Sequence, residues 1–277
     1  MVKKSSRRTV GIHGINDASR WVFNRIATGY HARPPYPSEL VDAIKELASL
    51  RGPRLCDIGA GIGHLALPLA ERGLHVTAVE PAERMLERLR DTASKAGLPV
   101  RSVHASAEKL PFDSQHFDAI LIADALHFID SELAAREIRR VLSPSGVLMI
   151  LTCDWASTPY MRQLAQVVEK ATQRRPRRIN SRTVQLSGVA GIPLTYSRVY
   201  EEELPVTPAQ LQQILATVSF IGPAMNRERT QSFHAMIQGI PLPAAWGRRM
   251  TLTWGFGEDK ERRLTQTPAA LSQCVPT

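Results

Sequence analysis

Cysteine is scarce in this chain of 277 residues, which contains only Cys56, Cys153 and Cys274. An odd number of cysteines with no Cys-x-x-Cys pair excludes a disulfide framework and predicts no metal site of the zinc type. Long apolar runs are also missing, since no stretch approaches the ~18 consecutive apolar residues of a membrane span. The chain starts with basic residues that no apolar segment follows, so we predict no secretory signal. We therefore expect a soluble, cytoplasmic protein with no membrane partner.

Acidic residues are fewer than basic ones, at 26 against 35, which gives a formal net charge of +9. The basic excess lies in residues 1–50 and 156–277, whereas residues 51–155 are slightly acidic. The densest basic cluster is Arg174–Arg178, with Arg182 just beyond it. Such a cluster either steers an anionic partner or is a solvated loop. No aromatic residues lie between the arginines, so the sequence disfavours a nucleic-acid partner bound by base stacking.

Apolar segments of strand length alternate with helical periodicities between residues 53 and 152. Strands are predicted at 53–58, 74–79, 100–104, 117–122 and 147–152, and helices at 65–71, 81–97 and 131–142. This alternation predicts an α/β fold with a parallel sheet covered on both faces, and right-handed crossovers make the sheet doubly wound. Beyond residue 155 we predict helices at 160–172, 207–220 and 226–238, a loop through 187–193, and strands at 195–204 and 250–256.

The first strand ends in the glycine-rich stretch Leu55–Gly63, with the pattern Asp-x-Gly-x-Gly-x-Gly, and a helix follows. Glycines at such a turn let the backbone approach a ligand closely, and ligands of open α/β sheets bind beyond the carboxyl ends of strands. A dinucleotide site of the pattern Gly-x-Gly-x-x-Gly would need a glycine where His64 stands. Asp57 would also repel a pyrophosphate. Both features disfavour an NAD(P)-dependent oxidoreductase.

Glu80 ends the second strand, where a carboxylate can accept hydrogen bonds from both hydroxyls of a ribose. Asp57 can either accept a hydrogen bond from an ammonium group or hold the glycine loop through its backbone amides. A ligand with a ribose and an ammonium group but no phosphate fits both residues. S-adenosylmethionine has this composition.

Further segments occur in a fixed order around these residues: Phe23–Pro34, Val79–Leu86, Ser106–Phe112, Phe117–His127 and Arg140–Gly146. Together with the glycine loop they resemble the class I S-adenosylmethionine-dependent methyltransferases. The resemblance is to the small-molecule branch (methyltransferase type 11), which includes the ubiquinone and menaquinone methyltransferases, and it covers residues 22–153. It implies a doubly wound, Rossmann-like sheet with an N-terminal helical cap and a helical lid insertion after the fifth strand.

The resemblance also divides the chain into five segments. These are a basic segment and helical cap at 1–45, a cofactor-binding core at 46–155, a lid insertion with the arginine cluster at 156–194, a C-terminal part of the core at 195–257 and a flexible tail at 258–277.

The resemblance implies roles for individual residues. Asp57, Gly59 and Gly61 would line the methionine end of the cofactor, Glu80 the ribose and Met85 the adenine. The other interpretation of Met85 is a core methionine, and Arg33 would either meet the cofactor carboxylate or cap the rim of the pocket. Tyr30 or Phe23 would close over the sulfonium, where an aromatic face gains cation–π attraction. The family often has aspartate where Ser106 stands. The full set of predicted cofactor residues is Tyr30, Arg33, Asp57, Gly59, Ala60, Gly61, Glu80, Pro81, Met85, Ser106, Ala107, Glu108, Ala123 and Asp124.

His127, which follows the fourth strand, is the first candidate for a general base, and His31 on the cap is the second. A base is needed for a hydroxyl or carbon acceptor but not for a carboxylate or an amine. The other interpretation of His127 is a pocket-lining residue without a proton role. Asp154 and Tyr160 are expected to line the acceptor pocket.

The sequence therefore predicts an enzyme that transfers a methyl group from S-adenosylmethionine, leaving S-adenosylhomocysteine, to a small-molecule acceptor. Oxygen is favoured over nitrogen or carbon as the methylated atom, and the basic flanks predict an acidic or carrier-tethered acceptor guided by Arg174–Arg178. The alternative is an RNA or protein methyltransferase, although no Asn-Pro-Pro-Tyr motif follows the fourth strand. A binding protein without turnover is a third hypothesis. The sequence leaves the acceptor and the oligomeric state open.

Overall fold

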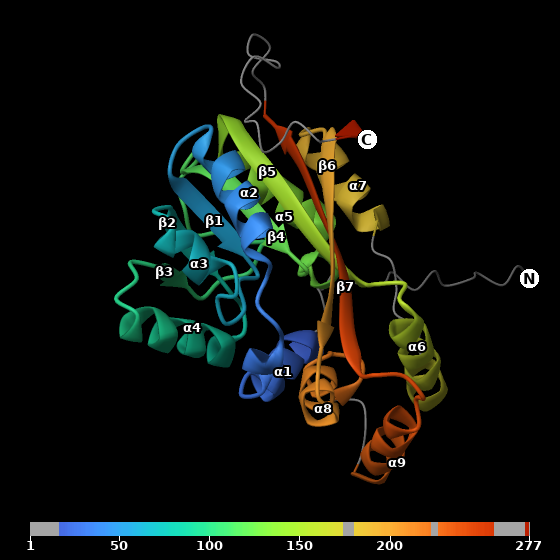
Figure 1. Cartoon of the computed structure of the whole chain (residues 1–277). Helices are drawn as coiled ribbons and strands as arrows, with labels where there is room; N and C mark the ends of the chain where they lie inside the picture. The colour runs from blue at the N-terminus through green and yellow to red at the C-terminus, as the bar shows by residue number, and fades with distance from the viewer. Residues whose placement is uncertain (1–16, 174–179, 223–226, 258–274, 277) are drawn as a thin grey trace, which may run out of the picture.

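The structure is a computed structural model that describes residues 17–173, 180–222, 227–257 and 275–276 (Figure 1). The Arg174–Arg178 cluster, the basic start of the chain and most of the predicted tail lie outside these residues. No helix in the described ranges is long and apolar enough to cross a membrane.

The described residues form one sheet with the strand order β3-β2-β1-β4-β5-β7-β6-β8. Strands β1 to β5 are parallel, and β7 is antiparallel to both β5 and β6. The strand order reverses between β1 and β4, which opens a crevice at their carboxyl ends. The doubly wound α/β prediction is therefore confirmed. The strands are β1 (Arg54–Ile58), β2 (His75–Val79), β3 (Arg101–Val103), β4 (Phe117–Ala123), β5 (Leu142–Trp155), β6 (Tyr196–Pro205), β7 (Ala245–Phe256) and β8 (Val275–Pro276).

Alternating side chains of the central strands fill two apolar cores, one on each face of the sheet. On β4, Ala119 and Leu121 pack against one set of helices, while Ile120 and Ile122 pack against the other. Helices α2 (Ser38–Ser49), α3 (Ala66–Glu71) and α4 (Glu83–Lys95) contribute to the first core. Helices α5 (Ser131–Val141) and α7 (Asn180–Ala190) contribute to the second. Because both faces are covered there, the central strands β4 and β5 contain nearly continuous runs of buried apolar residues.

The remaining helices lie beyond the carboxyl ends of the parallel strands, at the lower edge of Figure 1. They are α1 (Asp17–Ile26), α6 (Pro159–Thr172), α8 (Pro208–Ala216) and α9 (Arg227–Gln238), together with the short 3₁₀ turns η1 (Tyr30–Ala32) and η2 (Leu126–Phe128). Helices α6, α8 and α9 share an apolar cluster of their own with Trp246 of β7. We call these three helices the lid.

The lid differs from the sequence prediction in its connectivity. Helix α6 follows β5, as expected, but α7 packs against α5 and covers the sheet instead. The lid is completed by α8 and α9, which come from the segment 195–257 that was assigned to the core. Two stretches of chain separated by α7 and β6 therefore build it.

Two local predictions are wrong. Residues 187–190 are not loop but the last turn of α7, because Leu186 and Ala190 are buried against the sheet and Gly191, at φ +65°, ends the helix. The predicted tail contains a short strand, since Val275 and Pro276 pair with Ser197 and Tyr196 of β6.

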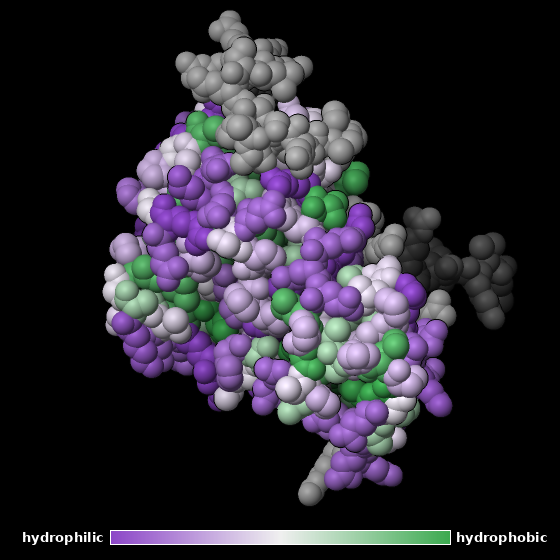
Figure 2. Space-filling model, viewed as in Figure 1, coloured by the Kyte–Doolittle hydropathy of each residue, from purple (hydrophilic) through white to green (hydrophobic). Residues whose placement is uncertain are grey.

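The face of the molecule in Figure 2 is mainly hydrophilic, with apolar areas interrupted by polar ones.

Candidate active site

The glycine loop after β1 forms the floor of the site. Gly59 and Gly61 adopt φ values of +75° and +58°, which are strained for residues with a side chain. The N–H groups of Gly59 and Ala60 both donate to the carbonyl of Val79, at 2.8 and 3.1 Å. A Cβ on Gly59 would lie 2.6 Å from the Cβ of Ala125, so the loop has no room for one. The glycines thus keep the backbone itself exposed to the crevice.

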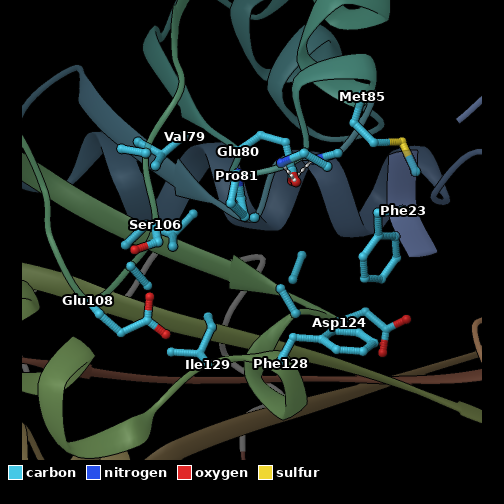
Figure 3. A pocket seen from close by; sticks show the side chains of 18 of the residues that line it. Phe23, Val79, Glu80, Pro81, Met85, Ser106, Glu108, Asp124, Phe128 and Ile129 are labelled. Carbon is cyan, nitrogen blue, oxygen red and sulfur yellow. Dashed lines mark hydrogen bonds between the residues drawn. The ribbon is translucent and has the colours of Figure 1, made fainter. Parts of the chain in front are cut away.

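Glu80 clamps this loop to the start of α4 (Figure 3). Its Oε2 accepts a hydrogen bond from the N–H of Gly61 at 2.9 Å, and its Oε1 accepts one from the N–H of Ala82 at 2.8 Å. The residue is only 5% exposed, and this burial raises the pKa of Glu80 while the two amides oppose the rise. Each carboxylate oxygen has a second lone pair, so both can accept a further donor from the crevice.

A first cavity, with a volume of about 90 Å³, lies above Glu80. In Figure 3, Met85, Phe23 and Phe128 lie along one side, and Ser106, Glu108 and Ile129 lie along the other. Glu80, Glu108 and Asp124 are its charged lining residues, and no Lys, Arg or His of the described chain lines it. The cavity is therefore a narrow, largely apolar slot with carboxylates at its edges, which suits a ring and hydroxyl groups but not a phosphate.

Asp57 is almost completely buried at the end of β1, with 2% of its surface exposed. It accepts a hydrogen bond from the backbone N–H of Ala66, the first residue of α3. Burial, and secondarily the nearby Glu80 carboxylate, raise the pKa of Asp57 to about 7. This hydrogen bond comes from the helix that follows the glycine loop, whereas the two predicted roles were toward an ammonium group or toward the amides of the loop itself.

Asp124 follows β4 with a left-handed backbone, at φ +49°. Such a conformation costs about 1–3 kcal/mol in a residue other than glycine and tends to occur at functional sites. Its N–H donates to the carbonyl of Leu151 at 2.8 Å, and its carboxylate lies 3.8 Å from Nη1 of Arg33. Burial raises the pKa of Asp124 to about 6, although the Arg33 charge opposes this.

Arg33 connects the N-terminal cap to the lid. Its Nε donates to Oγ1 of Thr217 and its Nη2 to the carbonyl of the same residue, both at 3.0 Å. Its guanidinium lies 4.4 Å from the ring centre of Tyr30, and the Tyr30 ring stacks on His64 at 5.8 Å. Because Thr217 directly follows α8, this one side chain ties the cap and the lid together above Asp124.

A second, larger cavity of about 930 Å³ by the same measure begins on the far side of Asp124. It shares Tyr30, Gly59, Asp124 and other residues with the first cavity, so the two lie side by side. Its remaining wall is contributed by the ends of β5 and β7, by η2 and by the lid region. The lining there is Tyr36, His127, Cys153, Asp154, Trp155, Gln173, Arg182, Val218, Ser219, Phe220, Trp246 and Arg248.

The structure brings together all fourteen residues predicted to bind a cofactor. The first cavity is lined by Tyr30, Gly59, Gly61, Glu80, Pro81, Met85, Ser106, Ala107, Glu108, Ala123 and Asp124, and the second adds Arg33, Asp57 and Ala60.

The other predicted residues are divided. His127 and Asp154 line the second cavity. His31 is exposed and lines neither cavity, and its Nδ1 lies 2.9 Å from the carbonyl of Thr28, so the structure does not support it as a base at the acceptor. Tyr160 is buried in the apolar cluster of the lid, because it lies on the inner face of α6.

His127 remains neutral near pH 7. Burial, and then the charges of Arg182 and Arg33, lower the pKa of His127 to about 4. A neutral imidazole can accept a hydrogen bond from an acceptor hydroxyl, but at this pKa it is a weak general base. The structure therefore favours the pocket-lining interpretation of His127.

Several lining residues were not predicted from the sequence. Phe128 and Ile129 continue the segment that contains His127, and Ala105 directly precedes the predicted Ser106. Arg248 is one of two adjacent arginines in β7 and is the buried one of the pair, which the sequence alone does not distinguish. Among the described residues, no group of three His, Cys, Asp or Glu side chains is arranged to hold a metal ion.

Comparison of the sequence and of the fold with known proteins finds methyltransferases. Residues 56–150 match the family model of a methyltransferase domain. An uncharacterized methyltransferase of Mycobacterium tuberculosis, Rv3342, is 37% identical over 138 residues, which are 49% of this chain and 54% of Rv3342. The chain thus spans about half the length of the curated relatives it matches.

Two solved structures share the fold. YcgJ from Bacillus subtilis has a TM-score of 0.56 and 18% identity, covering 79% of this chain and 98% of YcgJ. A SAM-dependent methyltransferase from Thermotoga maritima has a TM-score of 0.52 and 22% identity, covering 86% and 99%. Residues 56–150 therefore match a methyltransferase domain, and the strand order and glycine loop described above lie within or beside this segment. The solved structures share the Rossmann-like sheet of this chain.

Proposed function

We propose that the chain transfers a methyl group from S-adenosylmethionine to a small molecule held in the second cavity. The observation that carries this proposal is that the two cavities adjoin at Asp124, which lines both of them. One is a slot with buried carboxylates, and the other is a larger chamber with aromatic walls. A donor and an acceptor bound in them would meet beside Asp124.

The residues of the slot fit this cofactor. Glu80 would accept from the ribose hydroxyls with the lone pairs that Gly61 and Ala82 leave open. Met85 and Phe128 would lie against the adenine, and its amino group would donate a hydrogen bond to an oxygen of Glu108 or Ser106. A pyrophosphate would find only carboxylates here among the charged lining residues, which supports a cofactor without phosphate.

The outer part of the site fits the methionine end. Asp57 and Asp124 would face an ammonium group, and the Arg33 guanidinium would face a carboxylate. When bound, S-adenosylmethionine supplies a methyl group on a sulfonium sulfur, which keeps the electron pair of the broken bond while the acceptor's lone pair forms the new one. The protein's part is to position the acceptor in line and to exclude water, for which Tyr30, Phe23 and the lid are placed.

The shape of the second cavity supports a small acceptor over RNA or protein. Residues at the end of α6 and after α8 line it together with the ends of two central strands, so an acceptor would lie beneath the lid. A macromolecular acceptor would have to present one flexible group through this chamber. The same volume fits a bulky small molecule.

The test combines binding and transfer. Calorimetric titration with S-adenosylhomocysteine should show one site per chain, and no binding would contradict the proposal. Incubation with methyl-labelled S-adenosylmethionine and a lysate of the source organism should place label in the small-molecule fraction, whose mass identifies the acceptor. Label in RNA or protein would instead support the macromolecular alternative. Cofactor binding without labelling of any fraction would support a binding protein without turnover.

A further inference from the structure

Three arginines line the second cavity, and two of them already have a carboxylate partner. Arg248 donates from Nε to Oε1 of Glu202 at 2.6 Å and from Nη1 to the carbonyl of Pro34 at 3.0 Å. Arg33 faces Asp124, as described above. The charge of Arg248 is therefore compensated within the protein, and Arg33 is assigned above to the carboxylate of the cofactor. Neither is left to hold an anionic acceptor.

Arg182 is different. It lies one turn before Leu186 on the buried face of α7, and its Nη1 donates to the carbonyl of Ile129, the residue directly after η2, at 3.0 Å. Its charge acts on the neighbouring His127 in the same wall. Within the described ranges, that backbone carbonyl is its hydrogen-bond partner and no carboxylate lies within 4 Å of it. The guanidinium retains donors for a ligand.

The wall around this cation is aromatic. Trp155 and Trp246 meet edge to face, with ring centres 5.6 Å apart. Phe220 and Phe128 line the same chamber. Such walls bind a flat, apolar body, while a single polar group fixes its orientation.

We propose that Arg182 binds the carboxylate of an aromatic acid, and that such acids are the acceptor class of this site. The inference rests on the proposed function, which it makes more specific. One planar guanidinium matches one carboxylate through two parallel hydrogen bonds. A phosphate dianion suits the chamber less well, because Asp57, Asp124 and Asp154 also line it and Arg182 is the one cation there without a carboxylate partner in the described chain.

Calorimetry on the full chain, saturated with S-adenosylhomocysteine, tests this assignment. The probes are two matched pairs, indole-3-acetate with indole-3-acetamide and 4-hydroxybenzoate with 4-hydroxybenzamide. The wild-type chain should bind at least one acid about 10-fold more tightly than its amide, the size expected of a charge-assisted hydrogen bond. Arg182→Gln should abolish this preference and Arg182→Lys should retain part of it. Arg136→Gln, which removes an exposed arginine of α5 paired with Glu132, should leave it unchanged.

The proposal is overturned if the wild-type chain binds acid and amide equally, if it binds neither acid, or if Arg182→Gln keeps the preference. Titration of each variant with S-adenosylhomocysteine separates this from the proposed function. Wild-type chain that fails to bind S-adenosylhomocysteine contradicts the proposed function itself. If wild type and Arg182→Gln bind S-adenosylhomocysteine equally well but the wild-type chain shows no preference for the acid over the amide, the Arg182 assignment alone is contradicted.

Discussion

Replacing Glu80 by glutamine tests most directly whether the first cavity binds the adenosine part of the proposed cofactor. The two side chains have the same shape, but glutamine is neutral and one of its two terminal atoms is a donor. In the wild-type chain both terminal oxygens accept backbone N–H groups, from Gly61 and from Ala82. Whichever way the glutamine amide turns, its NH₂ group faces one of these donors. Glu80→Gln therefore loses one hydrogen bond and leaves one buried N–H group without an acceptor.

The cost follows from these contacts. A hydrogen bond to a charged group contributes about 1.5–3 kcal/mol, and a buried donor left unpaired costs about 1–3 kcal/mol. Against this, the substitution removes a buried charge, whose desolvation is visible in the raised pKa of Glu80. We expect a net loss of about 1–2 kcal/mol in the free energy of unfolding. The ribose would also lose a charged acceptor, so the dissociation constant for S-adenosylhomocysteine should rise about 10–100-fold.

Calorimetry with S-adenosylhomocysteine and urea unfolding measure the two effects separately. The matched control is Glu83→Gln, in the first turn of the same helix, where the side chain is partly exposed and pairs with Arg90. It should leave the affinity unchanged. If Glu80→Gln binds S-adenosylhomocysteine as tightly as the wild-type chain, Glu80 does not hold the ribose and the assignment of the slot to adenosine is refuted.

Two further substitutions test the loop and the second cavity. Gly59→Ala should destabilise the fold by about 2–4 kcal/mol and weaken cofactor binding, because it combines a positive φ with overlap on Ala125. Gly73→Ala has a similar φ, +87°, but open space around the new methyl group, so it should cost only about 1 kcal/mol; equal losses in urea unfolding would contradict the overlap. In the wild-type chain the pKa of His127 is about 4, below the ordinary value of 6.5. As the pH falls, the unfolded state therefore takes up this proton before the folded state does. The free energy of unfolding consequently decreases between about pH 7 and pH 4. His127→Gln should reduce the loss of urea midpoint between pH 7.5 and 5.0, whereas the exposed control His75→Gln should not; an unchanged loss in His127→Gln would show that His127 titrates normally.

The sheet and the residues that line the first cavity could be predicted because their signals are local. The glycine loop and Glu80 each follow a buried strand within a few residues, and the carboxyl ends of parallel strands must meet at one edge. The order of strands then brings Ser106 and Asp124 to the same crevice, although they are far from the glycine loop in the sequence. Each of these placements depends on strand direction and not on the detailed packing of side chains.

The lid could not be predicted in this way, because its geometry depends on distant contacts. Arg33 donates a hydrogen bond to Thr217, which is 184 positions away in the sequence. No local sequence pattern around either residue predicts this contact. Helix α7 contains Gly188 and has little amphipathic periodicity, so only its burial against α5 makes it helical. His31 looked like a second base because it lies close to Tyr30 in sequence, yet the 3₁₀ turn there directs it to solvent.

The arginines likewise show that the number of charges in a segment does not identify the charge that contacts a ligand. The sequence draws attention to Arg174–Arg178 because five residues there include four arginines. Solvent-exposed charges in general are screened over about 10 Å at 0.1 M salt, so they accelerate encounter more than they select a ligand. A cation on a cavity wall, with a hydrogen-bonded orientation and aromatic neighbours, is screened less and acts at contact distance. Selection among acceptors should therefore depend on Arg182, which the sequence alone shows only as the residue just beyond the cluster.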